Sequence, residues 1–179
     1  MVYMFLADGF EEVEALTPLD ILRRARIPVS TVGVDSTAVC GAHNIEVKAD
    51  ISEADVNLCD MTAIILPGGM PGTLNLEKSE TVQKAIAHAM NHNLPIAAIC
   101  AAPSILGHAG YLRDRRATCY PGFEEDLLGA HVVDEPIVWD GNILTAKGAG
   151  VAMEFAFALV SCLASEDISQ EIRGAIQCR

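Results

Sequence analysis

Positive charge is scarce in this chain. Its 179 residues include 12 lysines and arginines against 24 aspartates and glutamates, which gives a formal net charge of −12. A surface of this sign repels nucleic-acid phosphates and anionic membranes. The one basic cluster, residues 113–116, is short and is interrupted by an aspartate. We therefore expect neither a nucleic-acid partner nor a membrane partner.

Long apolar runs are also missing. No segment reaches the roughly 20 apolar residues that a helix needs to cross a bilayer. The first apolar run, residues 2–6, stops before Asp8 and follows no basic leader, so we interpret it as a buried strand rather than a signal peptide. These features predict a soluble, cytoplasmic protein.

The six cysteines lack the spacing of a metal site. No two of them have C-x-x-C spacing, so a zinc site or a redox dithiol has little support. His88 and His92 are four residues apart but have no third ligand, and we interpret them as part of a solvated helix face. The glycines of residues 67–69 and 148–150 match neither common phosphate-binding motif. We expect no metal and no cofactor.

Apolar runs alternate with helical patterns along the whole chain. This order indicates βαβ units, and hence an α/β fold with a mostly parallel sheet covered on both faces, in a single domain spanning residues 1–179. Pro18 should kink or break the first helix. The expected strands are 2–6, 29–34, 62–66, 95–99, 116–119, 132–133, 137–139 and 143–146. A small hairpin is expected at 39–40 and 45–48, a helical turn at 52–55, and helices at 10–26, 79–91, 101–107, 152–163 and 168–176.

Cys100 stands where a predicted buried strand meets a predicted helix. Small residues flank it, and Pro103 suits the first turn of that helix. This is the pattern of a nucleophile elbow, in which a tight turn lifts the nucleophile out of the sheet. A thiol at a helix N-terminus should have a pKa well below the ~8.5 of a free thiol. The alternative is an ordinary buried cysteine at a strand end.

Residues near other strand ends should meet Cys100, because ligands in such sheets bind beyond the carboxyl ends of the strands. The N–H groups of Gly69 and Ala101 are candidate oxyanion donors, although Gly69 could simply form a tight turn. Glu14 could face inward and stay protonated beside the sulfur. Glu11 and Glu12 are interpreted as solvated residues that stabilise the helix dipole, and His43 as a surface residue.

Five segments spread over most of the chain form a recognisable set: LADGFEEVE (6–14), PLDILRRA (18–25), LPGG (66–69), AAICAAP (97–103) and LTAKGAG (144–150) with Glu154 and Phe155. Taken together, these segments resemble the ThiJ/PfpI superfamily, also called the DJ-one family, and specifically its DJ-one/YajL-like branch. The resemblance implies a flavodoxin-like three-layer sandwich, a homodimer, an oxidation-sensitive nucleophile at Cys100 and a protonated partner at Glu14. It also implies an anion pocket shaped by Gly69 and Ala101.

The same resemblance offers Gly68, Arg24, His43 and Tyr120 as further pocket candidates. Arg24 matches a position near the dimer interface, and His43 lies in a loop that could reach the partner's site. Tyr120 stands where some members carry a histidine close to the thiol, which argues against a Cys/His pair and against peptidase activity. Ala149 replaces a proline common at that position.

Two functions follow from these residues. The first is a glyoxalase or deglycase type of enzyme, in which Cys100 attacks small reactive dicarbonyls without glutathione or metal. The second is a redox-responsive, stress-related or chaperone-like protein in which oxidation of Cys100 is itself the event. A retained fold with a silent site is the third possibility.

Overall fold

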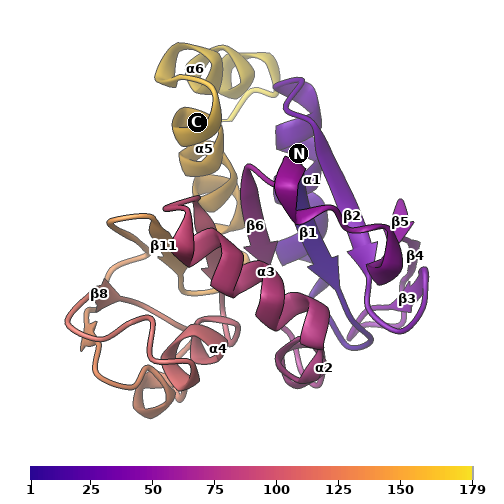
Figure 1. The fold of residues 1–179 in the computed structure, drawn as a ribbon. Coiled ribbons are helices and arrows are strands. Elements are labelled where there is room, and N and C mark those ends of the chain that lie inside the picture. Colours follow the sequence, from indigo (N-terminus) through magenta and orange to yellow (C-terminus); the bar gives the residue numbers. More distant parts are fainter. Residues whose placement is uncertain (179) are drawn as a thin grey trace.

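The computed structural model describes residues 1–178 (Figure 1). The strands alternate with helices through most of the chain, as the sequence predicts. The strands are β1 (Val2–Leu6), β2 (Val29–Gly33), β3 (Ala38–Cys40), β4 (Glu46–Lys48), β5 (Ile51–Ser52), β6 (Ala63–Leu66), β7 (Ile96–Ile99), β8 (Arg116–Ala117), β9 (His131–Val132), β10 (Ile137–Asp140) and β11 (Ile143–Ala146). The helices are α1 (Glu12–Arg24), α2 (Gly72–Lys78), α3 (Glu80–Asn91), α4 (Pro103–His108), α5 (Ala152–Leu163) and α6 (Glu166–Ala175), with 3-10 turns η1 (Glu53–Asp55), η2 (Leu58–Asp60), η3 (Glu124–Asp126) and η4 (Ala149–Val151).

The central sheet has seven strands in the order β10-β11-β7-β6-β1-β2-β5. All neighbouring pairs are parallel except β10 with β11. The strand order reverses between β1 and β6, which makes this a doubly wound sheet with its switch point at that junction. Strands β3 and β4 pair antiparallel as the predicted small hairpin. The expected fold class is therefore confirmed.

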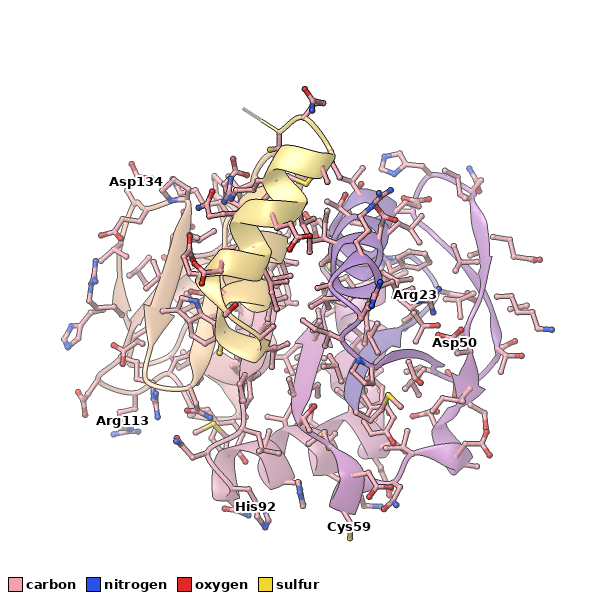
Figure 2. All side chains as sticks on the ribbon, turned by 90° about the horizontal axis from the view of Figure 1, so that it is seen from above. Arg23, Asp50, Cys59, His92, Arg113 and Asp134 are labelled. Atoms are coloured by element: carbon pink, nitrogen blue, oxygen red, sulfur yellow. The ribbon has the colours of Figure 1, made fainter. Side chains whose placement is uncertain are left out.

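Helices cover both faces of the sheet, so the structure has three layers. One core cluster lies under α1, α5 and α6 and includes Leu22, Phe155 and Phe157. The other lies under α2, α3 and α4 and includes Phe5, Leu66 and Ile86. Figure 2 shows the α5–α6 pair next to α1 on one side, with His92 at the end of α3 on the other. Because β6 and β7 are buried on both faces, their sequences are continuously apolar. The buried β11 is apolar except for Thr145, whose hydroxyl oxygen accepts a hydrogen bond from the N–H of Thr118.

Several elements differ from the sequence prediction. Strand β5 was not expected, and α6 begins at Glu166 rather than residue 168. Helix α1 begins at Glu12 rather than residue 10 and continues without a break through Pro18. Helix α2 was not predicted, because its seven residues have no side-chain cap to mark the start. Helix α4 begins at Pro103, so Cys100 lies three residues ahead of it. Within residues 1–178, no helix has the length and apolar character needed to cross a membrane.

Candidate active site

The carboxyl ends of β6, β7 and β11 lie side by side next to the switch point. The strand register pairs Leu66 with Ala98 and Ala146 with Ile99. The turns that follow these strands therefore share one edge of the sheet, where α1 also begins. This arrangement brings Cys100, the Gly68–Gly69 turn and Glu14 together, as the sequence argument predicts.

Cys100 has the strained backbone of a nucleophile elbow. Its φ angle is +65°, a left-handed conformation that costs a non-glycine residue about 1–3 kcal/mol. Two hydrogen bonds hold it there: its N–H donates to the carbonyl of Ala146 at 2.9 Å, and its carbonyl accepts from the N–H of Tyr120 at 2.8 Å. The side chain remains partly exposed. Strain maintained in this way is typical of functional turns.

Glu14 faces inward from the first turn of α1. Only 1% of its surface is exposed, and its Oε2 accepts a hydrogen bond from the N–H of Gly68 at 3.0 Å. Burial raises the pKa of this carboxyl to about 7, although hydrogen bonds from the Cys100 side chain and from Gly68 oppose the shift. A carboxyl of this pKa can both hold and release a proton near neutral pH.

Two consecutive glycines make room for this contact. A Cβ on Gly68 would lie 2.6 Å from the Cβ of Cys100 and 2.7 Å from Oε2 of Glu14. Gly69 has a φ of +91°, which a residue with a side chain rarely adopts. Its N–H and that of Ala101 are directed at the sulfur, where both lower the pKa of the Cys100 thiol. The Gly68–Gly69 turn thus lets Cys100 and Glu14 approach each other closely and also supplies a hydrogen-bond donor to the sulfur.

The pKa of Cys100 moves in the direction opposite to the one predicted from the sequence. Burial, followed by the negative charge of Glu14, raises it to about 12. The prediction relied on a helix N-terminus, but α4 has six residues and begins only at Pro103, so burial outweighs its dipole. The repulsion from Glu14 exists only while its carboxyl is ionised. When Glu14 is protonated that repulsion disappears, so the two groups titrate as a coupled pair.

The position of Glu12 also differs from the prediction. It was expected to be solvated, yet it is 4% exposed and joins α1 to the β3–β4 hairpin. Its Oε1 accepts from the N–H groups of His43 at 2.8 Å and Ile45 at 3.4 Å, and its Oε2 lies 2.8 Å from the Nδ1 atom of His43. Gly41 allows this approach, because a Cβ there would lie 2.3 Å from Oε1 of Glu12.

One group of metal-type ligands occurs among the described residues. Ligand atoms of Glu11, Glu12 and His43 lie within 4.8 Å of one another. His43 is exposed as expected, and its pKa is raised because its side chain bonds to Glu12 and because Glu11 lies close. The carboxylate of Glu12 is already occupied by the hairpin donors. We therefore assign this group a structural role.

The remaining pocket candidates, Arg24 and Tyr120, lie at different distances from Cys100. Arg24 is paired with Asp20 at the exposed C-terminal end of α1, ten residues or about 15 Å along the helix from Glu14. It does not line the Cys100 site of its own chain, which corrects that expectation. Tyr120 does adjoin the site, through its backbone bond to Cys100 and through a ring that lies against Gly148.

The loop after β11 contributes a group that the sequence argument did not assign. The N–H of Ala149 lowers the pKa of Glu14 by hydrogen bonding, and Oε1 of Glu14 lies 3.6 Å from the position of a Cβ on Gly148. The loop was compared with phosphate-binding motifs and carries part of the family resemblance, but none of its residues was assigned to the site. Its position directly after a buried strand, the same signal that marks Gly68 and Cys100, could have identified it.

Comparison with known proteins addresses the family and the fold. The model of the DJ-1/PfpI family matches residues 1–162. Protein dj-1beta of Drosophila melanogaster is 34% identical over 172 residues, which cover 94% of this chain and 92% of that protein. A protein of Pyrococcus abyssi named as a deglycase is 35% identical over 153 residues, 83% of this chain and 90% of that one. The crystal structure of Drosophila melanogaster DJ-1beta superposes with a TM-score of 0.94 at 32% identity, covering 99% of this chain and 97% of that chain.

Proposed function

The chain belongs to the DJ-1/PfpI family, and from this premise we propose that it is a cysteine-dependent enzyme acting on small reactive dicarbonyls. The observation that carries the proposal is the buried Glu14, which is hydrogen-bonded to the Cys100 thiol at a strained elbow. The deglycase name of the relative from Pyrococcus abyssi agrees with this reaction class. No cofactor enters the proposed reaction.

The first step forms a bond between sulfur and the aldehyde carbon. Ionised Glu14 takes the thiol proton as the sulfur attacks, and the proton passes to the carbonyl oxygen to give a hemithioacetal. The N–H groups of Gly69 and Ala101 stabilise the negative charge on that oxygen during the attack. Because the thiol pKa is about 12 and the carboxyl pKa is about 7, transfer of the thiol proton to Glu14 is uphill on its own and therefore accompanies the attack of the sulfur on the carbonyl.

The second step moves hydrogen between the two carbons. Glu14, ionised again, removes the proton from the former aldehyde carbon, the enediolate forms, and Glu14 returns the proton to the neighbouring carbon. The product is a thioester of a 2-hydroxy acid on Cys100, which water hydrolyses to the free acid and the thiol. No oxidant is consumed, because one carbon is oxidised as the other is reduced. Removal of the same adduct from an amine or thiol would begin with the same attack.

The test measures loss of methylglyoxal and formation of lactate at neutral pH, with chelator present and without glutathione. We expect activity in the unaltered protein and none above background in Cys100→Ala. Cys119→Ser is the matched control. That thiol is also buried, with its pKa raised to about 11, but it packs into the core on the other face of the sheet. Absence of a Cys100-dependent reaction would refute the proposal.

A redox-responsive role is the second candidate. The feature that favours it is the protonated Glu14 beside a partly exposed sulfur, since its O–H can donate to a sulfinate oxygen. Two equivalents of peroxide would convert the thiol to sulfinate, with release of water. Mass spectrometry after mild peroxide should find two added oxygens on Cys100 before any other cysteine; prior oxidation of another cysteine would count against this role.

Two further features belong to the proposal. We infer that the protein is a homodimer located in the cytoplasm. Val13 on α1 and Ile45 beside the β3–β4 hairpin expose 47% and 52% of their surfaces, which suits a self-association face. Arg24, which lies far from Cys100 within one chain, could act at a partner's site only through such an assembly. Sedimentation at micromolar concentration tests the dimer, and a monomeric mass would contradict it.

A further inference from the structure

An apolar cavity adjoins the thiol site on the side of the β11 loop. It has a volume of about 270 Å³ and is lined by Tyr120, Pro121, Val151 and residues 147–150. None of these residues has a role in the reaction steps proposed above. The cavity therefore offers space that the chemistry itself does not use.

Three contacts connect this cavity to the reacting groups. The N–H of Tyr120 donates to the carbonyl of Cys100 at 2.8 Å. A Cβ on Gly148 would lie 3.3 Å from Cδ2 of Tyr120 and 3.6 Å from Oε1 of Glu14, so the tyrosine ring and the carboxyl approach the same glycine. The Ala149 amide bonds to Glu14. A group extending from Cys100 past Glu14 would meet the ring of Tyr120.

The lining favours an uncharged, flat group. Lys147 is the one charged side chain among the lining residues that the structure describes, and its ammonium is paired with Asp134. The remaining side chains of the lining include those of Pro121 and Val151, which are apolar. Tyr120 exposes 51% of its surface, which leaves a ring available for stacking.

We propose that this cavity holds the non-reacting substituent of the dicarbonyl and that Tyr120 makes the site prefer aryl over methyl substituents. The inference rests on the proposed function insofar as the ligand is a carbonyl compound attacked by Cys100. Offset stacking on Tyr120 favours a phenyl group over a methyl group by roughly three- to tenfold in rate. Tyr120 acts here as a specificity-determining residue and takes no proton.

The primary experiment does not depend on turnover. Cys100 is alkylated with 2-bromoacetophenone or with bromoacetone, which differ only in a phenyl or methyl group on the carbonyl. The sulfur bonds to the CH₂ carbon and bromide leaves. Rates at the Cys100 peptide are followed by mass spectrometry, and the aryl-to-methyl ratio is divided by the same ratio for N-acetylcysteine. We expect a normalised ratio of roughly three to ten.

Variants identify the ring as the cause. Tyr120→Ala should bring the normalised ratio to about one, whereas Tyr120→Phe should keep it because the ring remains. Leu128→Ala is the matched control: this apolar residue exposes 53% of its surface and lies outside the cavity lining. It should leave the ratio unchanged. Circular dichroism confirms that each variant is folded.

The outcomes separate this inference from the proposed function. A normalised ratio near one in the unaltered protein, a ratio that survives Tyr120→Ala, or a Cys100 that neither reagent alkylates would each overturn it. Turnover of phenylglyoxal and methylglyoxal provides the second measurement. A Tyr120-dependent alkylation ratio without turnover would refute the enzyme and keep the subsite. Turnover with an alkylation ratio that does not depend on Tyr120 would refute the subsite and keep the enzyme.

Discussion

Glu12 and Glu14 lie two residues apart in the first turn of α1, and their pKa values shift in opposite directions. Both are buried, and burial on its own raises the pKa of a carboxyl. At Glu14 burial prevails and the pKa rises to about 7. At Glu12 hydrogen bonds from the His43 ring and from backbone N–H groups outweigh burial, and the pKa falls. The kind of donor and the depth at which each carboxyl is enclosed together decide which one stays ionised.

The opposite pKa shifts suit the two residues to different roles, structural for Glu12 and chemical for Glu14. Glu12 is held as a charge that joins the hairpin to α1, and it has no contact with the thiol among those that the structure describes. Glu14 accepts from the Cys100 thiol and from two backbone N–H groups, but burial outweighs them and keeps its pKa at about 7, so it can exchange its proton near neutral pH. A pair of substitutions at these two positions therefore separates structural support from chemistry.

The largest expected difference is in activity. Glu14→Ala should lower kcat/KM for methylglyoxal by roughly 100- to 10,000-fold, because a general acid–base group is lost. Glu12→Ala should stay within roughly threefold of the unaltered protein while it lowers thermal stability. Steady-state kinetics with the folded variants compares them. Equal losses of activity would mean that both carboxyls act only through structure.

The second prediction concerns the pH dependence of stability. Glu14 has a folded pKa of about 7 against 4.5 unfolded, so the folded state binds its proton more tightly. The stability it contributes is present below pH 4.5 and is lost as the pH rises through 7, by roughly 3 kcal/mol. Glu12 has the opposite sign, since its folded pKa is lowered and its contribution is lost as the pH falls.

Urea denaturation at a series of pH values between 4 and 8 measures this effect. The unaltered protein should lose stability relative to Glu14→Gln over that range, because glutamine does not titrate. Other titrating groups are common to both proteins and cancel in the difference. Parallel stability curves would show that the Glu14 pKa is close to its unfolded value.

The third prediction compares the glycines that accommodate the two carboxyls. Gly68→Ala places a Cβ against the Cβ of Cys100, which cannot move away, and should cost about 1–3 kcal/mol together with most of the activity. At Gly41→Ala the three atoms nearest to the new Cβ all belong to the side chain of Glu12, which can shift, so this variant should cost less and spare activity. Thermal melts and kinetics test both; a more disruptive Gly41→Ala would contradict the ranking.

The smallest expected effect is that of His43→Ala. The pKa of His43 is raised by its bond to Glu12 and by Glu11, so its contribution is present below pH 6.5 and is lost as the pH rises through its folded value. The side chain is exposed, and the backbone donors to Glu12 remain in the variant. The shift in melting temperature should be smaller than for Gly41→Ala and larger at pH 6 than at pH 9. A pH-independent shift would exclude the ion pair as its cause.

Local sequence was sufficient for much of the fold and for the centre of the site. Helix α5 has the predicted bounds, and Ser79 caps α3 as expected, because apolar periodicity and capping residues act within one element. Cys100 and Glu14 were predicted to meet because each follows closely on a buried strand. Helix α2, which lacks a side-chain cap, gave no such local signal.

What the sequence determined by itself is the order of strands and helices, the elbow at Cys100 and the inward face that carries Glu14. Tertiary structure decided the pKa of Glu12, Glu14 and Cys100. Glu12 is buried because its donors come from a hairpin some 30 residues away, and the pKa of Cys100 rises because elements distant in sequence remove water from its sulfur. The physical reason is that periodicity is a property of neighbours along the chain, whereas solvation and hydrogen-bond partners depend on which segments meet in space.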